Sequence, residues 1–170
     1  MTYQIGLAAH DLSCRRGGRL LFEGLSFTLD PGEALLVTGP NGAGKTSLLR
    51  LIAGLLPLEG GSFRVTGASP DAMLPELCHY VGHANGIKTS LSVRENLAFY
   101  AEFLGGDGAD LADALAAFKL GELADFPAGL LSAGQKRKLA LSRLFAAPRP
   151  IWLLDEPSVS LDAASIKQLD

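Results

Sequence analysis

Eight consecutive residues of this chain match a phosphate-binding loop, the pattern G-x-x-x-x-G-K-[ST], which wraps main-chain amides around the phosphates of a nucleotide. Glycines occupy its turn positions because such a wrap needs conformations and close approaches that side chains obstruct. A helix after the loop would add the positive end of its dipole. The residues are Gly39, Pro40, Asn41, Gly42, Ala43, Gly44, Lys45 and Thr46, followed by Ser47. They predict binding of a nucleoside triphosphate.

The polar side chains at the end of this loop have separate expected roles. Lys45 brings a full positive charge to the phosphates, and Thr46 places a hydroxyl where a Mg²⁺ ion that bridges the terminal phosphates would bind. Ser47 adds an amide and a second hydroxyl. The alternative is an ordinary glycine-rich turn. The short apolar run before the loop and the helical pattern after it disfavour that alternative.

A second candidate site follows an apolar run late in the chain. Residues 151–154 read Ile-Trp-Leu-Leu and are followed by Asp155 and Glu156. Because side chains alternate along a strand, adjacent acids at its end face different directions. We expect Asp155 to hold Mg²⁺, and Glu156 to orient or deprotonate the water that attacks the γ-phosphate. A charged strand end with no further role is the alternative.

A third motif lies between these two, where Leu131 precedes a short polar segment and a helical pattern. Ser132 has the position of a helix N-cap, and the amides after it form a potential anion site. Gly134 would let a phosphate held by another chain approach. Capping alone is the alternative explanation for such a helix start. The residues of the motif are Ser132, Ala133, Gly134 and Gln135.

The elements that must position these residues follow from the apolar pattern and the turn residues. They are strands at 5–12, 25–29, 34–37, 62–65 and 151–154, a helix at 46–53, and a mainly helical stretch at 91–144. The strand at 34–37 is expected to be buried and to lead into the phosphate loop. Together the elements predict an α/β fold whose first part is rich in strands.

The order of phosphate loop, Leu-Ser-Ala-Gly-Gln motif and acidic strand end resembles the ATP-binding subunits of ABC transporters. The resemblance covers the whole chain. It implies a P-loop NTPase fold of ABC type, with a mainly parallel central sheet, an N-terminal antiparallel β subdomain and a helical subdomain. It also implies a single domain over residues 1–170. The nucleotide-binding core would span about 1–82 and 146–170, and the helical signature subdomain about 83–145.

The resemblance further implies protein partners. Two subunits would pair head to tail, with each ATP between the phosphate loop of one and the Ser132 motif of the other, so that hydrolysis would need a dimer. Asp162, which follows Leu161 in the loop after the acidic pair, matches a position that contacts the partner's site. The other expected partners are an integral membrane permease subunit and haem-handling membrane proteins. This chain would then be a peripheral protein on the cytoplasmic face of a bacterial inner membrane. Residues 84–90 are the preferred contact surface, and ordinary solvent loops are the alternative.

A narrower resemblance lies in residues 80–97. Most ABC ATPases carry glutamine where His83 falls, and the Gly-His-x-x-Gly-Ile-Lys-Thr run resembles the haem-exporter ATPases of cytochrome c maturation. It implies an ATPase that powers haem export or the release of a haem chaperone, with His83 sensing the γ-phosphate and Mg²⁺. A surface or core histidine with no functional part is the alternative for His83. For the chain, the alternatives are an ATPase subunit for another solute and a shortened nucleotide-binding module without turnover.

Two departures from the family pattern concern base recognition and turnover. The aromatic residue that stacks on adenine in many ABC ATPases would fall near Arg15 and Arg16. The guanidinium of Arg16 could stack on the base or could be a solvated loop charge, and we favour the solvated charge. All three histidines of the chain precede the Ser132 motif, and they are His10, His79 and His83. None therefore matches the later histidine that contacts the γ-phosphate in the family. We expect weak base selectivity, and turnover by a chain ending at Asp170 is an open question.

The composition argues against several other classes of protein. A chain of 170 residues, 48% of them hydrophobic, fits one compact domain. The net charge of −3 and the lack of a long basic block argue against a nucleic-acid partner. Cys14 and Cys78 match no metal or redox spacing and are predicted to be reduced thiols. We see no signal-peptide pattern and no apolar run of about 18 residues, so we expect a cytoplasmic location.

Overall fold

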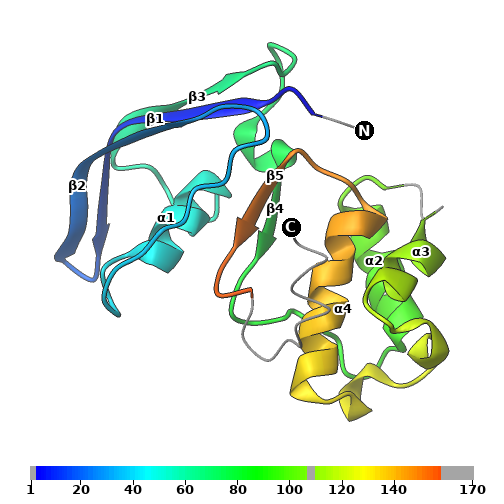
Figure 1. The fold of residues 1–170 in the computed structure, drawn as a ribbon. Helices are drawn as coiled ribbons and strands as arrows, with labels where there is room; N and C mark the ends of the chain where they lie inside the picture. Colours follow the sequence, from blue (N-terminus) through cyan, green and yellow to red (C-terminus); the bar gives the residue numbers. More distant parts are fainter. Residues whose placement is uncertain (1–2, 107–109, 158–170) are drawn as a thin grey trace. The chain divides into compact units, whose positions relative to one another are not determined.

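The computed structural model describes residues 3–106 and 110–157. The chain divides into two compact units between Tyr80 and Val81, and each unit is described by itself. Figure 1 shows the elements in chain order. They are β1 (Gly6–Arg16), β2 (Arg19–Leu29), α1 (Lys45–Ile52), β3 (Gly60–Thr66), β4 (Cys78–Val81), α2 (Val93–Phe103), α3 (Leu111–Ala117), α4 (Ala133–Ala146) and β5 (Ile151–Leu154), with 3-10 turns at Leu74–Leu77, Gly121–Leu123 and Ala128–Leu130.

The first unit is built on an antiparallel sheet with strand order β2-β1-β3. Gly17 and Gly18 have positive φ angles of 56° and 79°, which suit the tight hairpin between β1 and β2. The register shifts between Ala9 and Leu12, so two residues separate these buried side chains instead of one. Such an irregularity keeps apolar side chains on the same face of the strand. The predicted antiparallel β subdomain is therefore confirmed.

The predicted buried strand at 34–37 is absent from the described structure. Residues 33–40 have no regular secondary structure, and the side chains of Leu35 and Leu36 are 46% and 85% exposed. A strand exists only where a neighbour supplies the ladder of hydrogen bonds. The described sheet of this unit does not include these residues, so an apolar run alone does not make them a strand. The helix after the loop is present, and it begins one residue earlier than predicted.

The second unit has a helical core. Helices α2 and α3 both pack against α4, and the rings of Phe118 and Phe145 meet edge to face, with centroids 5.6 Å apart. The indole of Trp152 on β5 lies 6.0 Å from the Phe145 ring, so this strand also packs on α4. The side chains that are fully buried in this core include Val93, Leu97, Leu115, Phe118, Leu120, Leu139, Leu141 and Leu144. The predicted helical stretch is thus confirmed.

Strands β4 and β5 pair in a two-stranded sheet, and the division between the units falls within β4. The main-chain N–H of Asp155, just after β5, donates to the carbonyl of Val81 at 3.0 Å. Strand β4 was not among the predicted elements. None of the helices in the described parts of the chain is long and apolar enough to span a bilayer.

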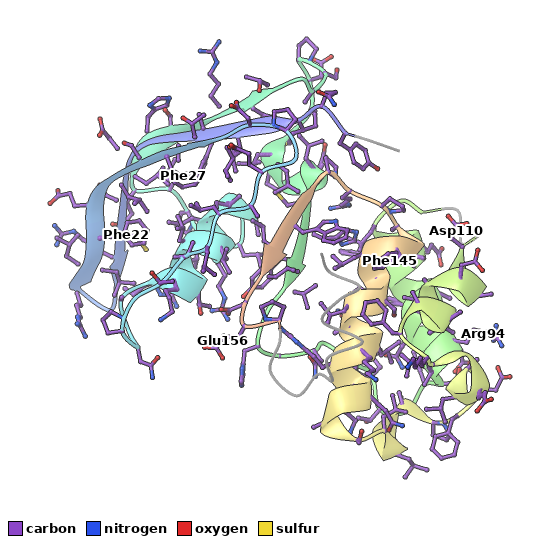
Figure 2. The ribbon with its side chains drawn as sticks, viewed as in Figure 1. Phe22, Phe27, Arg94, Asp110, Phe145 and Glu156 are labelled. Atoms are coloured by element: carbon purple, nitrogen blue, oxygen red, sulfur yellow. The ribbon has the colours of Figure 1, made fainter. Side chains whose placement is uncertain are left out.

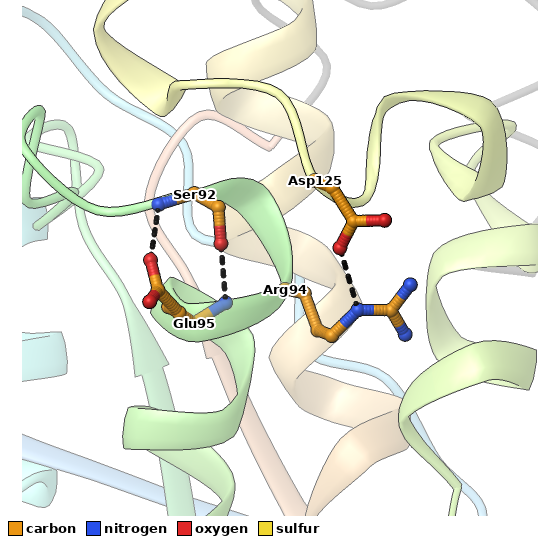
Figure 3. A network of polar contacts seen from close by, with 4 residues as sticks. All are labelled: Ser92, Arg94, Glu95 and Asp125. Carbon is orange, nitrogen blue, oxygen red and sulfur yellow. Dashed lines mark hydrogen bonds and ion pairs between the residues drawn. The ribbon is translucent and has the colours of Figure 1, made fainter.

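The start of α2 is fixed by two polar contacts, drawn in Figure 3. The Ser92 hydroxyl accepts from the Glu95 amide at 3.1 Å, and the Glu95 carboxylate accepts from the Ser92 amide at 2.7 Å, which makes a capping box. The hydrogen bond from the Ser92 amide to the carboxylate is the main cause of the lowered pKa of Glu95. Beside them, Arg94 pairs with Asp125 at 3.0 Å. The helix therefore begins at a defined residue, directly after the loop that carries His83.

Candidate functional site

The phosphate loop lies in the first unit, directly before α1. Gly39, Gly42 and Gly44 have φ angles of 144°, 82° and 102°. These values fall in a region that residues with side chains rarely adopt, so the glycines of the pattern stand where the main chain requires them. The amide of Ala43 donates to the carbonyl of Pro40 at 3.2 Å and closes a turn inside the loop. The turned path that the sequence predicts is therefore present.

Lys45 is the first residue of α1 and folds back onto the loop. Its Nζ donates to the carbonyl oxygens of Gly39 at 2.8 Å and Pro40 at 3.0 Å. A phosphate oxygen is a stronger acceptor for an ammonium group than a neutral carbonyl, and could replace either contact. Gly44, the residue before α1, has no side chain that could cap the first amides of the helix. The loop thus combines a cation with a helix start suited to an anion.

Two residues of β2 support this loop and were missed by sequence reasoning. A Cβ placed on Gly44 would lie 3.0 Å from Cδ1 of Phe22 and 3.2 Å from Cβ of Leu21. The loop therefore needs glycine at this position for space as well as for its φ angle. Figure 2 labels Phe22 on its strand. Arg16, the predicted position nearest to an adenine contact, is exposed at the end of β1.

The acidic pair behaves as two different groups. Asp155 is buried, at 7% exposure, whereas Glu156 is exposed. The adjacent acids therefore lie in different environments, as alternation at a strand end predicts. Glu156 has a φ angle of 50°, which is uncommon for a residue other than glycine. Figure 2 labels Glu156 at the turn after β5.

The Leu-Ser-Ala-Gly-Gln motif forms the start of α4. The Ser132 hydroxyl accepts from the Gln135 amide at 3.2 Å, and Oε1 of Gln135 accepts from the Ser132 amide at 2.8 Å. Ser132 is thus the N-cap of a capping box, as predicted. Ser132 and Ala133 are exposed, whereas Leu131 is buried and anchors the motif on the core. Capping is observed, and anion binding at this helix start stays a prediction.

The loop that carries His83 is held by residues that sequence reasoning missed. His83 itself is exposed, so it is not a core histidine. The Arg143 guanidinium donates to the carbonyl of Asn85 at 2.6 Å and lies 3.4 Å from the centre of the Tyr100 ring. The Tyr100 hydroxyl donates to the carbonyl of Gly86 at 2.7 Å. Burial lowers the pKa of Arg143 to about 10, so it remains charged at neutral pH.

A buried amide fixes the far end of the same loop. Asn96 is 2% exposed, and its Nδ2 donates to the carbonyls of Lys88 and Ser92, both at 2.9 Å. Its Oδ1 accepts from the Lys88 amide at 2.8 Å. The loop is therefore fastened at Asn85 and Gly86 by α4 and α2, and at Lys88 by α2. The sequence signal for this was the asparagine on the buried face of a helix, where an amide must find partners.

The predicted site residues divide between the two units. The residues from Gly39 to Ser47 lie together in the first unit, and His83, Asp155, Glu156 and the Ser132 motif lie in the second. Asp162 lies outside the described residues.

Comparison with known proteins gives consistent results. The sequence pattern of the ABC transporter family matches residues 22–159. A protein of Nitrobacter hamburgensis named cytochrome c biogenesis ATP-binding export protein CcmA is 55% identical over 162 residues, covering 93% of this chain and 79% of that protein. A CcmA of Rhodopseudomonas palustris is 54% identical over 156 residues, covering 92% and 78%. A solved structure of an ATP-binding subunit of an ABC transporter has a TM-score of 0.84 at 26% identity, covering 96% and 71%.

Proposed function

This chain belongs to the ABC transporter family and, within it, to the cytochrome c biogenesis ATP-binding export proteins, and from this we propose that it binds and hydrolyses ATP to power an export step of cytochrome c biogenesis. The step is haem export or the release of a haem chaperone, as the resemblance around His83 implies. Its fold is the ABC-type P-loop fold, as predicted. The observation that carries the proposal is the phosphate loop. Lys45 donates hydrogen bonds to two main-chain carbonyls of this loop, and three glycines with positive φ angles turn its backbone.

The residues of the loop would bind the triphosphate in complementary ways. The main-chain amides and the start of α1 receive phosphate oxygens, and Lys45 exchanges its carbonyl partners for them. The remaining loop residues, including Gly39 to Ala43, provide the turned backbone. The glycine at position 44 fits the role, because a side chain there would collide with Phe22.

The hydroxyl of Thr46 and the carboxylate of Asp155 are the oxygen donors that would hold Mg²⁺, an ion that takes one or two protein oxygens together with phosphate oxygens. When bound, Mg²⁺ neutralises charge that develops on the phosphates. Glu156, exposed beyond the strand end, would orient the attacking water and accept its proton. His83, exposed on its loop, would sense the γ-phosphate.

The proposed protein partners are a second ATP-binding subunit and an integral membrane permease. In the head-to-tail dimer, the nucleotide site of each subunit would be contacted by five residues of the other subunit, namely Ser132, Ala133, Gly134, Gln135 and Asp162. The exposed helix start at Ser132 suits this role. The permease would place the subunit on the cytoplasmic face of the inner membrane as a peripheral protein. We also propose that residues 146–170 belong functionally with 1–82, and 83–145 with the helical signature subdomain.

Calorimetry with Mg·ATP tests nucleotide binding. Lys45→Ala should weaken binding roughly 10- to 150-fold, because a hydrogen bond to a charged group contributes about 1.5–3 kcal/mol. Arg64→Ala is the matched control, since it removes an exposed cation from the same unit. Equal affinity in the Lys45 variant and the control would contradict the assignment of the loop.

A genetic assay tests the biological step. In a bacterium that lacks its own cytochrome c biogenesis ATPase, the wild-type gene should restore haem-stained c-type cytochromes, and Glu156→Gln should not. Restoration by Glu156→Gln at the wild-type level would exclude Glu156 as the base. Failure of the wild-type gene, when the protein is present and binds ATP, would favour a transporter for another solute.

A further inference from the structure

Arg137, in the second turn of α4, has a guanidinium group that joins three segments of the second unit. The side chain is buried, at 5% exposure. Its Nη1 donates to the carbonyl of Gly82 at 2.7 Å, and its Nη2 donates to the carbonyls of Asp155 at 2.8 Å and Glu156 at 3.1 Å. Longer contacts reach Oδ1 of Asn85 at 3.4 Å and the carbonyl of Pro157 at 3.5 Å. One side chain thus holds both the residue before His83 and the acidic pair.

Arginine is suited to this position for a geometrical reason. The guanidinium is a flat group with five donors in fixed directions, so one edge can serve one segment while another edge serves a second. A lysine has one nitrogen and cannot bridge two separated carbonyls in the same way. At the acidic strand end, the acceptors are main-chain oxygens. The contacts therefore set the path of the backbone without using the carboxylates of Asp155 and Glu156.

The backbone at this point needs such support. Glu156 has a φ angle of 50°, an uncommon conformation for a residue with a side chain. Residues in such conformations persist where their surroundings over-determine them. Arg137 donates to the carbonyls of Asp155 and Glu156, which lie directly before and after the Cα of Glu156 along the chain. This fixes the direction in which the Glu156 side chain leaves the chain.

Arg137 also connects this turn to the start of α4. It is four residues after Ala133, the first residue of the helix, so it lies about 6 Å along the helix axis from Ala133 of the Ser132 motif. A helix transmits displacement over so short a distance as a rigid body. A shift of the Ser132 motif would therefore move Arg137, to which the main chain at Glu156 and at Gly82 is bonded.

We propose that Arg137 is a positioning residue for ATP hydrolysis, which couples the position of the Ser132 motif to the orientation of Glu156 and of the loop carrying His83. This inference rests on the proposed function. It assigns no contact of Arg137 with the nucleotide. Removing Arg137 should therefore lower the rate of the chemical step and leave the affinity for ATP unchanged.

The test compares Arg137→Gln and Arg137→Lys in the full-length protein, assembled with its membrane partner, with Mg·ATP as the substrate. Arg149→Gln is the matched control, because Arg149 also donates to a main-chain carbonyl, that of Leu104 at 3.1 Å, and is not one of the proposed site residues. We expect Arg137→Gln to reduce kcat on the order of 10²-fold, as a small misplacement of a catalytic group does, with the Kd for ATP within about twofold of wild type. Arg137→Lys should recover part of the loss, and the control should keep the wild-type kcat.

A second measurement covers the case in which Arg137→Gln is unstable. Hydrogen exchange in peptides that cover 82–86 and 151–157 should rise together in Arg137→Lys, whereas exchange in α2 should stay as in wild type. An unchanged kcat in Arg137→Gln, or equal losses of kcat and ATP affinity, would overturn the inference. So would wild-type exchange in both peptides of Arg137→Lys. Lack of hydrolysis by the wild-type complex would instead overturn the proposed function, and the inference with it.

Discussion

The contact between the phosphate loop and β2 makes Gly44→Ala an informative substitution. Alanine at this position would have to adopt a φ angle of 102° and would bring its Cβ to 3.0 Å from Phe22 and 3.2 Å from Leu21. The phenyl ring can move, but the Cβ of Leu21 is fixed to its strand. The loop and β2 must therefore separate by a few tenths of an ångström at this contact, and we expect the shift to disturb the amide cradle.

Comparison with Gly42→Ala separates the free-energy cost of the positive φ angle from the cost of the close contacts with β2. Gly42 has a φ angle of 82°, and a Cβ added there meets no atom within 4 Å. Both variants carry the backbone cost of about 1–3 kcal/mol. Gly44→Ala adds an overpacking cost of about 1–3 kcal/mol. We therefore expect Gly44→Ala to be destabilised by about 1–3 kcal/mol more than Gly42→Ala, which corresponds to about 2–9 °C in the melting temperature for chains of this size.

Thermal and urea unfolding followed by circular dichroism would measure this difference. The double variant Phe22→Ala, Gly44→Ala should recover part of the added cost, because the ring contact is gone while the Leu21 contact remains. Binding of Mg·ATP should follow the same order, with Gly44→Ala the weakest. Equal stability of the two glycine variants would refute the reasoning, as would the absence of any recovery in the double variant.

Three further predictions concern the start of α2 and can be read by urea unfolding, with Trp152 fluorescence as the probe. Ser92→Ala should lower the free energy of unfolding by about 1 kcal/mol because the N-cap is lost. Arg94→Ala should change the free energy of unfolding less than Ser92→Ala does, since the ion pair of Arg94 with Asp125 is exposed. The opposite order would be inconsistent with the observed geometry. Asn96→Ala should cost roughly 1–3 kcal/mol by leaving buried polar groups without partners, and a neutral effect would argue against the observed bonds. The pKa of Glu95 is lowered from its ordinary 4.5, so the ionised carboxylate is favoured in the folded state. Its contribution to the free energy of unfolding is therefore full above pH 4.5 and is lost as the pH falls through the lowered value. Glu95→Gln should remove this part of the loss of stability in acid, and an unchanged dependence of stability on pH would contradict the assignment.

Local patterns predicted the parts of the site that depend on short stretches of chain. The phosphate loop, the Ser132 cap and the contrast between Asp155 and Glu156 follow from residue types at fixed spacing, and the loop path, the cap and the contrast in burial are observed. The strand predicted at 34–37 is absent because pairing depends on a neighbour that the run itself does not specify.

The arginines of α4 show why other site residues were missed. Arg137 stands between Lys136 and Lys138, and cations are seldom buried, so the run of charges itself does not indicate a buried side chain. Helical spacing nevertheless puts Arg137 on the same face as Ala140, Leu141 and Leu144, all of which are buried. Even so, the acceptors of Arg137 come from segments 18 and 55 residues away in the chain. Periodicity could have indicated that the charge is buried, but not what it binds.

The use of carbonyl oxygens by Arg137 has an evolutionary consequence. Because the strand end is held through groups that every amino acid possesses, the carboxylate at position 156 can be exchanged without dismantling the scaffold around it. Asparagine tolerates the left-handed backbone especially well. Under the proposed role of Glu156, exchange of this one side chain would yield a subunit that still binds nucleotide but no longer cleaves it, and a dimer could then combine one active and one inactive subunit.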